Sequence, residues 1–472
     1  MVFNSLTFAV FFAVVLLLHG LPLSWRARKL NLLVASYVFY AAWNPPFVVL
    51  LWISTAIDWL AAKAIATAPS AARRRGFLLL SLCANLGLLG FFKYGDFLLE
   101  TFTTLVAGLG LQYSPPRMDL VLPVGISFYT FQTMSYTLDV YLGRTGPWPS
   151  LLDFTLYVTF FPQLVAGPIV RAADFLPQCE SPRRANAQQL GWGAALLAMG
   201  LFEKVVLADG VMAPVADRVF GAARDVGAAA AWVGTLAFGG QIFFDFAGYS
   251  TCAIGAALAL GFVLPDNFRF PYAAVGFSDF WRRWHVSLST WLRDYLYVPL
   301  GGNRRGSART SVNLMLTMLL GGLWHGASWR FVAWGGLHGA CLMVERQARR
   351  RWGGAAWAST TAARVGLGLF TYAVVHLAWV FFRAESFGDA FALLRVMLTA
   401  GVGPLPLDAR EVLGVLAVTA ALLVGQWVLR DRFLEDAWAA LPWWARSLAL
   451  VTLMLPVVLT PGDDRAFIYF QF

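Results

Sequence analysis

Charged side chains are scarce in this chain of 472 residues. Only 13% of the residues are Asp, Glu, Lys or Arg, 59% are apolar, and the mean hydropathy is +0.63. Soluble domains carry about 25% charged residues, so a soluble globular protein is excluded. The net charge is +10, but no soluble segment is long enough to present a basic face to nucleic acid. The composition predicts a protein that lies among membrane lipids.

Cysteine and the common catalytic signatures are also rare or missing. The chain has 4 cysteines and no CxxC spacing, so neither a zinc site nor a disulfide framework is predicted. It lacks HExxH, a glycine-rich P-loop and a dinucleotide fingerprint, which excludes metalloprotease, NTPase and NAD chemistry. Without a GxSxG elbow or a Cys-His pair, no covalent nucleophile is indicated. We therefore expect no bound metal and no bound cofactor.

What the chain does have is a series of long apolar runs, for example Ser5–Leu23, Ala228–Gly261 and Val412–Leu429. Because a crossing needs about 20 apolar residues, the runs predict about ten to twelve transmembrane helices, with shorter re-entrant or interfacial helices between them. They lack the alternation of a lipid-facing β-strand. The predicted fold is all-α and polytopic, and since no linker is visible, residues 1–472 are predicted to form a single membrane-embedded domain.

Basic residues concentrate in short loops between these runs. They occur at Arg26–Lys29, Arg73–Arg75, Arg183–Arg184, Arg304–Arg309 and Arg346–Arg351. The positive-inside tendency places such loops on the cytoplasmic side. The positive net charge is therefore mainly a signal of orientation.

One stretch, Phe280–Tyr297, combines three arginines, an aspartate and a histidine. Read as a helix, it places its aromatic and apolar residues on one face and its charges on the others. Each charge at mid-membrane costs at least a few kcal/mol, so we expect an interfacial or re-entrant helix with its N-cap at Ser278–Asp279. His285 would then point inward with Trp281 and Trp284, which suit the headgroup boundary or a substrate groove. A core imidazole bonded to a backbone carbonyl is an equal alternative for this histidine.

A second stretch, Val312–Val344, also carries histidines. Its 33 residues would span about 50 Å as one helix, too long for one crossing and too short for two with a turn. A break is predicted at Gly321–Gly322 or at Gly326–Ser328. His325 lies between them, where an ionisable group suggests function, whereas His338 is predicted to be structural. A neutral imidazole can take a proton from a hydroxyl and return it, so His325 is the candidate general base.

Six motifs in order resemble the membrane-bound O-acyltransferase (MBOAT) family, in particular its bacterial branch with the alginate O-acetyltransferase membrane subunit. They cover most of the chain, and they are LPVGISFYTFQTMSYTLDVY (Leu122–Tyr141), FPQLVAGPIVR (Phe161–Arg171), FFDFAGYS (Phe243–Ser250), NFRFPYAAVGFSDFWRRWHVSLSTWLRDYLYVPLGGNRRG (Asn267–Gly306), LTMLLGGLWHGASW (Leu316–Trp329) and WVFFRAESF (Trp379–Phe387).

The resemblance implies a helical fold around a central tunnel with two histidines near its centre. These match His285 in WRRWH and His325 in LWHG, with the essential role on His325. It further implies a multi-pass enzyme of the bacterial inner membrane that moves an acetyl group from cytoplasmic acetyl-CoA towards a hydroxyl on the far side. His285 would orient the acyl group or polarise its carbonyl. The implied acceptor is an exported polysaccharide, alginate or cellulose, reached with an extracytoplasmic acetyltransferase partner.

Three more residues are candidates for substrate binding. Asp245 in FFDF would line the tunnel or pair with an arginine. Arg304 and Arg305 in GGNRRG would bind the phosphates of coenzyme A through guanidinium groups and backbone donors, although a basic loop that only sets orientation is an equal alternative. After GYS the chain has Thr251-Cys252, where this branch commonly has Asp-Met, which leaves the polysaccharide open.

Two other functions compete with O-acetyl transfer. A D-alanyl transferase for teichoic acids belongs to the same family. A transporter or polysaccharide channel would also use broken helices and intramembrane charges, but no paired repeat of broken segments is apparent in the two halves.

Overall fold

The computed structural model describes residues 1–472 except 114, 117–119, 356–359, 461–464, 466 and 469–472. The described residues form helices and turns and no β-strand, which confirms the all-α prediction. Contacts divide the chain into two compact units. Unit 1 comprises Met1–Gly193, Ala253–Pro265 and Gly326–Ser328, and unit 2 comprises Ala194–Cys252, Asp266–His325 and Trp329–Phe472. This division leaves the prediction of one domain over residues 1–472 untested.

Five helical segments in the described part are long and apolar enough to cross a membrane. They are Pro45–Thr67, Ala71–Gly108, Ala228–Ala259, Thr361–Arg383 and Ala409–Leu429. Two further apolar helices, Leu6–Gly20 and Trp443–Leu459, are shorter than 18 residues. The chain is thus a multi-pass membrane protein whose other predicted crossings fall on shorter or more polar helices.

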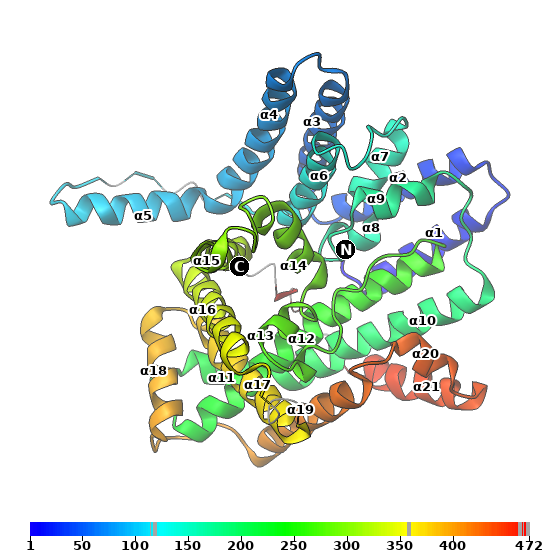
Figure 1. Cartoon of the computed structure of the whole chain (residues 1–472). Coiled ribbons are helices and arrows are strands. Elements are labelled where there is room, and N and C mark those ends of the chain that lie inside the picture. Colours follow the sequence, from blue (N-terminus) through cyan, green and yellow to red (C-terminus); the bar gives the residue numbers. More distant parts are fainter. Residues whose placement is uncertain (114, 117–119, 356–359, 461–464, 466, 469–472) are drawn as a thin grey trace. The chain divides into compact units, whose positions relative to one another are not determined.

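Unit 1 begins with antiparallel helices joined by short turns (Figure 1). Its elements are α1 (Leu6–Gly20), α2 (Trp25–Ala41), η1 (Pro45–Phe47), α3 (Val48–Thr67), α4 (Ala71–Leu89), η2 (Gly90–Tyr94), α5 (Gly95–Gly108), α6 (Ile126–Tyr141), α7 (Leu151–Thr159), α8 (Phe161–Leu164), α9 (Ala172–Phe175), η3 (Leu176–Cys179) and part of α10 (Ala187–Leu201). The 3-10 turn η1 separates α2 from α3, because its two prolines cannot supply the backbone donors that a continuous helix needs.

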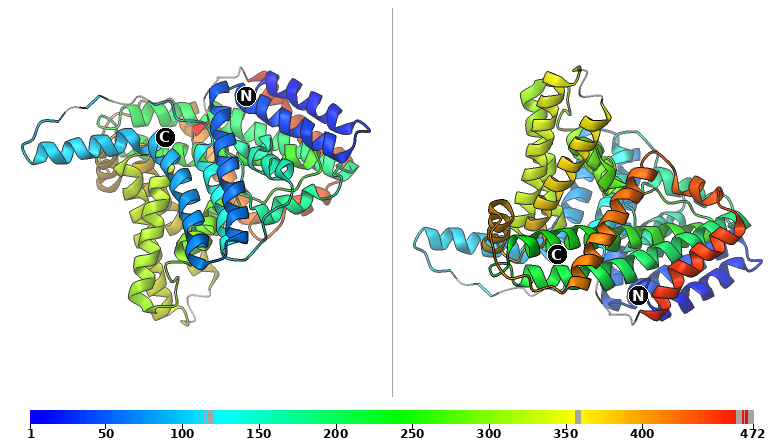
Figure 2. Two further views of the ribbon diagram at one scale, coloured as in Figure 1. Left: turned by 90° about the horizontal axis from the view of Figure 1, so that it is seen from above. Right: turned by 90° about the horizontal axis from the view of Figure 1, so that it is seen from below.

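A buried carboxylate holds three helices of unit 1 together. Asp58 of α3 is 0% exposed and accepts hydrogen bonds from Ser81 Oγ (2.5 Å) and Asn85 Nδ2 (2.8 Å) of α4. Thr137 Oγ1 of α6 donates a third at 2.6 Å. These helices lie side by side in Figures 1 and 2. Since apolar surfaces slide easily past one another, this network fixes the helices' register.

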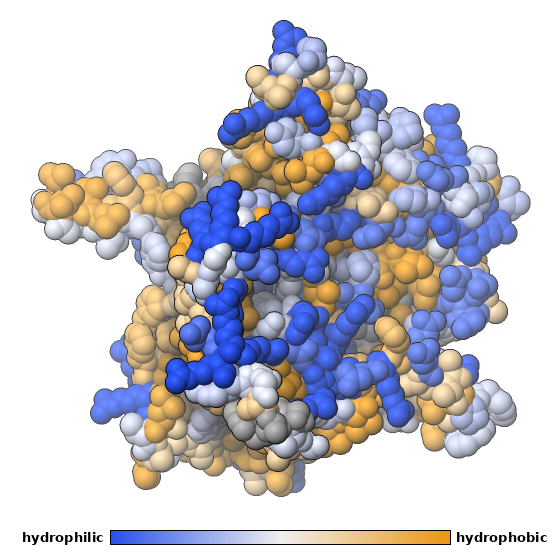
Figure 3. All heavy atoms as spheres, in the orientation of Figure 1, coloured by the Kyte–Doolittle hydropathy of each residue, from blue (hydrophilic) through white to orange (hydrophobic). Residues whose placement is uncertain are grey.

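Apolar side chains also cover outward faces of unit 1. On α5, Leu98, Phe102 and Leu105 are exposed, and the corresponding arm is orange in Figure 3. An exposed apolar stripe of this kind marks a surface that another apolar phase covers. In a membrane protein that phase is lipid.

Unit 2 contains the histidine segments. Its elements are the end of α10, η4 (Phe202–Met212), α11 (Ala213–Gly221), most of α12 (Ala228–Ala259), η5 (Pro271–Ala273), α13 (Phe277–Trp281), α14 (Val286–Leu292), η6 (Arg293–Tyr297), α15 (Gly306–His325), α16 (Trp329–Trp352), α17 (Thr361–Arg383), α18 (Phe387–Thr399), α19 (Ala409–Leu429), α20 (Leu434–Ala439) and α21 (Trp443–Leu459).

Helices α15 and α16 form a tight antiparallel pair (Figures 1 and 2). The break between them lies at Gly326–Ser328, one of the two predicted positions, while Gly321–Gly322 stays helical. Gly322 serves packing: a Cβ there would lie 2.2 Å from the carbonyl oxygen of Phe331, and one at Gly335 would lie 2.2 Å from that of Met318. The predicted break is thus confirmed. The two helices are nevertheless 20 and 24 residues long, because both continue beyond the apolar run into polar residues.

Candidate active site

The two predicted catalytic histidines meet inside unit 2. His285 is 0% exposed and His325 is 3% exposed, and their ring centroids are 6.4 Å apart. This proximity was expected and is confirmed. Their individual roles stay predictions.

His285 lies at a break, so the predicted continuous helix over Phe280–Tyr297 is wrong. Helix α13 ends at Trp281, and His285 has φ +43° and ψ +55°, a left-handed conformation that cannot continue a right-handed helix. The backbone groups freed by the break pair with a neighbouring segment. Val286 N donates to Asn267 O at 2.9 Å, and Arg269 N donates to Arg283 O at 2.9 Å.

The start of α13 also differs from the prediction. Its N-cap is Gly276, with φ +94°, and Ser278–Asp279 lies within the first turn. Ser278 N donates to Glu345 Oε2 of α16 at 2.9 Å, and Asp279 Oδ2 accepts from Val275 N at 2.9 Å. A carboxylate from another helix thus satisfies a donor that a local cap was expected to satisfy.

Asn267 orients the imidazole of His285. Its Oδ1 lies 2.9 Å from His285 Nδ1 and also accepts from Ser287 Oγ at 2.9 Å. Its Nδ2 donates to Ser250 Oγ at 3.1 Å. Because the amide oxygen can only accept, Nδ1 carries the proton and Nε2 carries the lone pair. Burial away from water lowers the pKa of His285 to about 3, so the ring is neutral at physiological pH.

Aromatic rings surround His325, the last residue of α15. Its ring centroid lies 5.1 Å from Trp324, 5.1 Å from Trp334 and 5.4 Å from Phe382. Trp324 also contacts His285, at 5.8 Å. Such walls limit the access of water to the imidazoles, which is what the predicted acyl transfer requires.

The two predicted substrate-binding tryptophans differ in position. Trp284 is a core residue that stacks on Phe280 (5.6 Å) and contacts Trp379 (5.1 Å). Trp281 contacts Trp334 at 5.7 Å, and Trp334 contacts His325. Trp281 is therefore one ring away from the candidate base, and a role in binding substrate stays a prediction for both.

Asp245 pairs with a lysine, whereas a tunnel lining or an arginine partner was predicted. Lys204 Nζ lies 2.7 Å from Asp245 Oδ1 and 2.9 Å from Asp209 Oδ1. Ile468 N donates to Asp245 Oδ2 at 2.6 Å. Lys204 and Asp209 lie on the π-helix η4, a form of helix that is frequent at functional sites. The next residue along α12, Phe246, contacts His285 at 4.6 Å, so the ion pair anchors one wall of the site.

Comparisons with known proteins show which family the chain belongs to. The chain is 36% identical to a probable alginate O-acetylase of Pseudomonas putida, with 100% of both chains covered. The chain belongs to the membrane-bound O-acyltransferase family. Residues 145–355 match "MBOAT, membrane-bound O-acyltransferase family", a range that contains both histidines.

Other relatives of this acyltransferase carry different names. It is 38% identical to a peptidoglycan O-acetyltransferase of Helicobacter pylori, over 78% of this chain and 73% of that protein. It is 29% identical to a teichoic acid D-alanyltransferase of Streptococcus thermophilus, over 47% of this chain and 56% of that protein. The protein is thus a multi-pass membrane O-acyltransferase, as the sequence predicted.

The basic loop of the acyltransferase lies between η6 and α15. Arg304 and Arg305 are exposed, unlike the buried histidines. Positive φ angles at Gly301 (+109°) and Gly302 (+55°) shape the loop, and Asn313 Nδ2 donates to Gly302 O at 2.9 Å. The loop is thus held in place while its guanidinium groups stay accessible, which suits both predicted roles.

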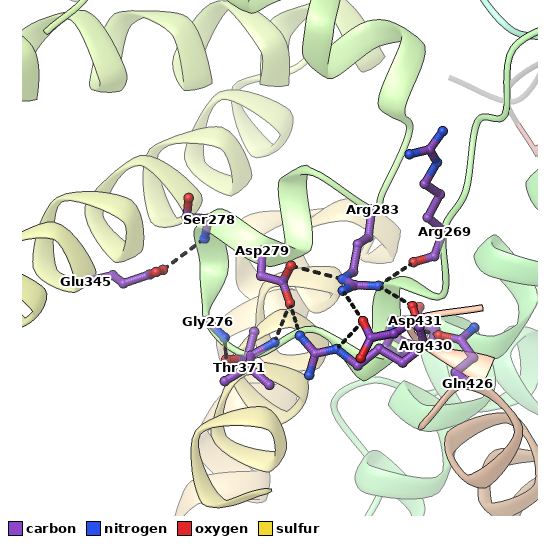
Figure 4. Close-up of polar contacts among 12 residues, drawn as sticks. Arg269, Gly276, Ser278, Asp279, Arg283, Glu345, Thr371, Gln426, Arg430 and Asp431 are labelled. Carbon is purple, nitrogen blue, oxygen red and sulfur yellow. Dashed lines mark hydrogen bonds and ion pairs between the residues drawn. The ribbon is translucent and has the colours of Figure 1, made fainter. Parts of the chain in front are cut away.

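An ion-pair cluster fixes α13 (Figure 4). Asp279 accepts from Arg283 Nε at 3.0 Å and from an Arg430 guanidinium nitrogen at 2.7 Å. Arg283 also donates to the carbonyl oxygens of Arg269 (3.2 Å) and Arg430 (3.1 Å). The charges that suggested an interfacial helix thus partly serve to tie the turn before His285 to the end of α19.

Sequence reasoning missed Asn267, which is the direct partner of His285. Its only signal is its place at the start of the long motif Asn267–Gly306, 18 residues before the histidine. At such a separation, no local periodicity predicts that two side chains meet. A buried imidazole does need a partner for its N–H, but the sequence does not say which residue supplies it.

Proposed function

We propose that this O-acyltransferase moves an acetyl group from acetyl-CoA, used on the cytoplasmic side, to a hydroxyl of an exported polysaccharide. The observation that carries the proposal is the pair of buried imidazoles, 6.4 Å apart between their ring centroids. Few other groups take and return a proton at neutral pH. The names of relatives similar over most of the chain, an alginate O-acetylase and a peptidoglycan O-acetyltransferase, support acetyl as the group transferred.

In the proposed reaction, His325 removes the proton of the attacking hydroxyl. The hydroxyl oxygen forms a bond to the thioester carbonyl carbon, the carbon–sulfur bond breaks, and the leaving thiolate takes the proton back from the imidazolium. The products are the acetyl ester and free coenzyme A. The aromatic shell of Trp324, Trp334 and Phe382 protects the thioester from water.

His285 orients a reacting group in this scheme. With Nδ1–H donated to Asn267, a neutral ring offers only a lone pair at Nε2. It therefore accepts a hydrogen bond, from the attacking hydroxyl or from His325, and does not polarise the carbonyl. The same geometry favours a second assignment, in which His285 is the base and Asn267 its orienting group, as catalytic bases commonly have such a partner.

The polymer and the partner belong to the proposal as well. Alginate is the acceptor that full-length similarity to an alginate O-acetylase favours, and cellulose or peptidoglycan are the alternatives. Where an extracytoplasmic acetyltransferase completes the transfer, the hydroxyl that His325 activates belongs to an intermediate acceptor, and the partner passes the acetyl group on to the polymer. The D-alanyl alternative rests on a relative that matches about half of this chain.

The test replaces His325 by Ala at normal expression in the native host. We expect the acetyl ester content of the exported polymer to fall to the background of a gene deletion, while the amount of polymer is unchanged. His285→Ala, assayed beside it, decides between the two assignments of the base, since the base has the larger effect. His19→Gln, a buried histidine of unit 1, is the matched control and should acetylate normally. Loss of the polymer itself in His325→Ala would instead support a transporter or channel.

A further inference from the structure

Three nitrogen-bearing rings form a cluster next to His325. They are Trp281 of α13 and Trp334 and His338 of α16. The ring centroids are 5.7 Å apart for Trp281 and Trp334, 5.0 Å for Trp281 and His338, and 4.8 Å for Trp334 and His338. Trp334 is 1% exposed and His338 is 2% exposed. Because Trp334 also contacts His325 at 5.1 Å, the cluster adjoins the candidate base.

The nitrogens of this cluster lack hydrogen-bond partners within the described part of the chain. This applies to Nε1 of Trp281, Nε1 of Trp334 and both ring nitrogens of His338, all of which are buried. On one face the imidazole stacks against Phe280, at 5.9 Å, which offers no acceptor. A buried polar group without a partner costs about 1–3 kcal/mol, and most such groups in native proteins are paired. Four of them together need a partner that the described residues do not supply, which is either water or a bound ligand.

The donor set selects the chemistry of that partner. Each indole donates one hydrogen bond and accepts none, and a neutral imidazole donates one and accepts one. The cluster therefore offers three donors and one acceptor, without formal charge. A hydrocarbon chain leaves these groups unpaired, and a phosphate would find no counter-charge. A chain of secondary amides, with carbonyl oxygens and N–H groups, satisfies both kinds of group.

We propose that Trp281, Trp334 and His338 bind the amide-bearing arm of the acyl donor and hold its thioester against His325. The inference rests on the proposed use of acetyl-CoA, whose pantetheine arm carries two secondary amides between the thioester and the phosphates. It gives Trp281 a ligand. It also replaces the structural role predicted for His338 with a positioning role, since that ring acts on the donor and not on the reacting atoms.

The test compares two donors on the purified, full-length protein. Acetyl-CoA carries the amides, and the acetyl thioester of 2-mercaptoethanol does not. In His338→Phe, which keeps an aromatic ring but removes both nitrogens, we expect kcat/KM for acetyl-CoA to fall about 10-fold, as for the loss of one or two hydrogen bonds. The loss should lie in KM, and kcat/KM for the amide-free donor should not change. Phe280→Leu is the matched control, because it alters packing on the same ring without removing a polar atom, and it should leave the ratio between the donors unchanged.

Direct binding of pantetheine, measured by calorimetry, provides a readout that does not depend on catalysis. The wild-type protein should bind pantetheine, and His338→Phe should bind it about 10-fold more weakly. Equal losses for both donors would show a structural role for His338, and failure of the wild-type protein to bind pantetheine would also overturn the inference. If the wild-type protein binds pantetheine but transfers acetyl from neither donor, the proposed function fails and the binding inference stands.

Discussion

Two regions of the molecule bury polar side chains among apolar helices. In one region these side chains have hydrogen-bond partners, and in the other they have none in the described part of the chain. Around Asp58 in unit 1, the carboxylate receives three hydrogen bonds from α4 and α6. In the Trp281–Trp334–His338 cluster of unit 2, four ring nitrogens find no partner among the described residues. The first region is complete within the protein. The second is complete only if water or a ligand satisfies these nitrogens.

This difference bears on the roles proposed for the two regions more than their depth does. Both regions are nearly inaccessible, with Asp58 at 0% and His338 at 2% exposure, so burial alone does not distinguish them. The pairing of the polar atoms does distinguish them. A buried donor that has left water costs free energy unless a ligand or a water molecule accepts its hydrogen bond. The comparison yields four predictions.

The largest effect is expected when the complete region is broken. Asp58→Ala leaves the donors of Ser81, Asn85 and Thr137 without their acceptor, at about 1–3 kcal/mol each, and opens a cavity between three helices. We expect little folded protein in the membrane and a large fall in the melting temperature in detergent. Thr67→Ala on the exposed end of the same helix is the control and should melt like the wild type. A variant at Asp58 that melts normally would show that the network does not hold these helices.

The element types of the fold were largely predictable, because long apolar runs in the sequence indicate membrane helices. The local conformation of Phe280–Tyr297 was not. Its aromatic spacing fits a helix of about five turns, yet the backbone at His285 adopts a left-handed conformation that ends a helix. Hydrogen bonds to a distant segment, such as Val286 N to Asn267 O, replace those of the helix. Periodicity shows which face of a helix would be apolar. It does not show whether the backbone groups form their hydrogen bonds within the helix or with a distant segment.

A second prediction concerns the α15–α16 pair that carries the incomplete region. In Gly322→Ala, the new Cβ meets the carbonyl oxygen of Phe331 at 2.2 Å, so the helices must separate, at about 1–3 kcal/mol. The melting temperature should fall, and His325 and Trp334, which face each other across this pair, should lose their alignment and with it activity. Gly336→Ala, whose Cβ meets only a flexible leucine methyl at 3.4 Å, should retain both. Equal behaviour of the two variants would contradict the close approach at Gly322.

Only the site residues with an ionisable side chain that can take part in catalysis were predictable. His285 and His325 stand out as ionisable groups in apolar sequence, and they do meet. Asn267 and Lys204 gave no such signal, since an asparagine in a loop and a lysine in a membrane segment each have several ordinary explanations. Asp245 was predicted to line the tunnel or to pair with an arginine. The π-helix that brings Lys204 to it cannot be seen in the sequence.

A third prediction tests the orienting role of Asn267. Asn267→Ala leaves Nδ1–H of His285 without its acceptor, and kcat should fall about 10- to 100-fold, by analogy with residues that orient metal-binding histidines. Asn267→Asp keeps the acceptor but adds a negative charge, which raises the pKa of His285 from its lowered value. Protonated His285 then accumulates as the pH falls, so this variant should lose activity on the acid side at a higher pH than the wild type. A uniform loss at every pH would indicate that Asn267 only supports the fold.

The smallest effect is expected at the exposed basic loop, where solvent screens each charge. If Arg304 and Arg305 bind the phosphates of coenzyme A, replacing both by Gln raises KM for acetyl-CoA a few-fold, by about 1 kcal/mol in total. KM for the amide-free acetyl thioester, which has no phosphates, should not change. The increase should also diminish at high salt, because exposed charges are screened. In His338→Phe the increase in KM should not depend on salt, because the contacts that this variant loses are buried and uncharged. If both variants show the same salt dependence, the two groups of residues do not contact separate parts of one donor.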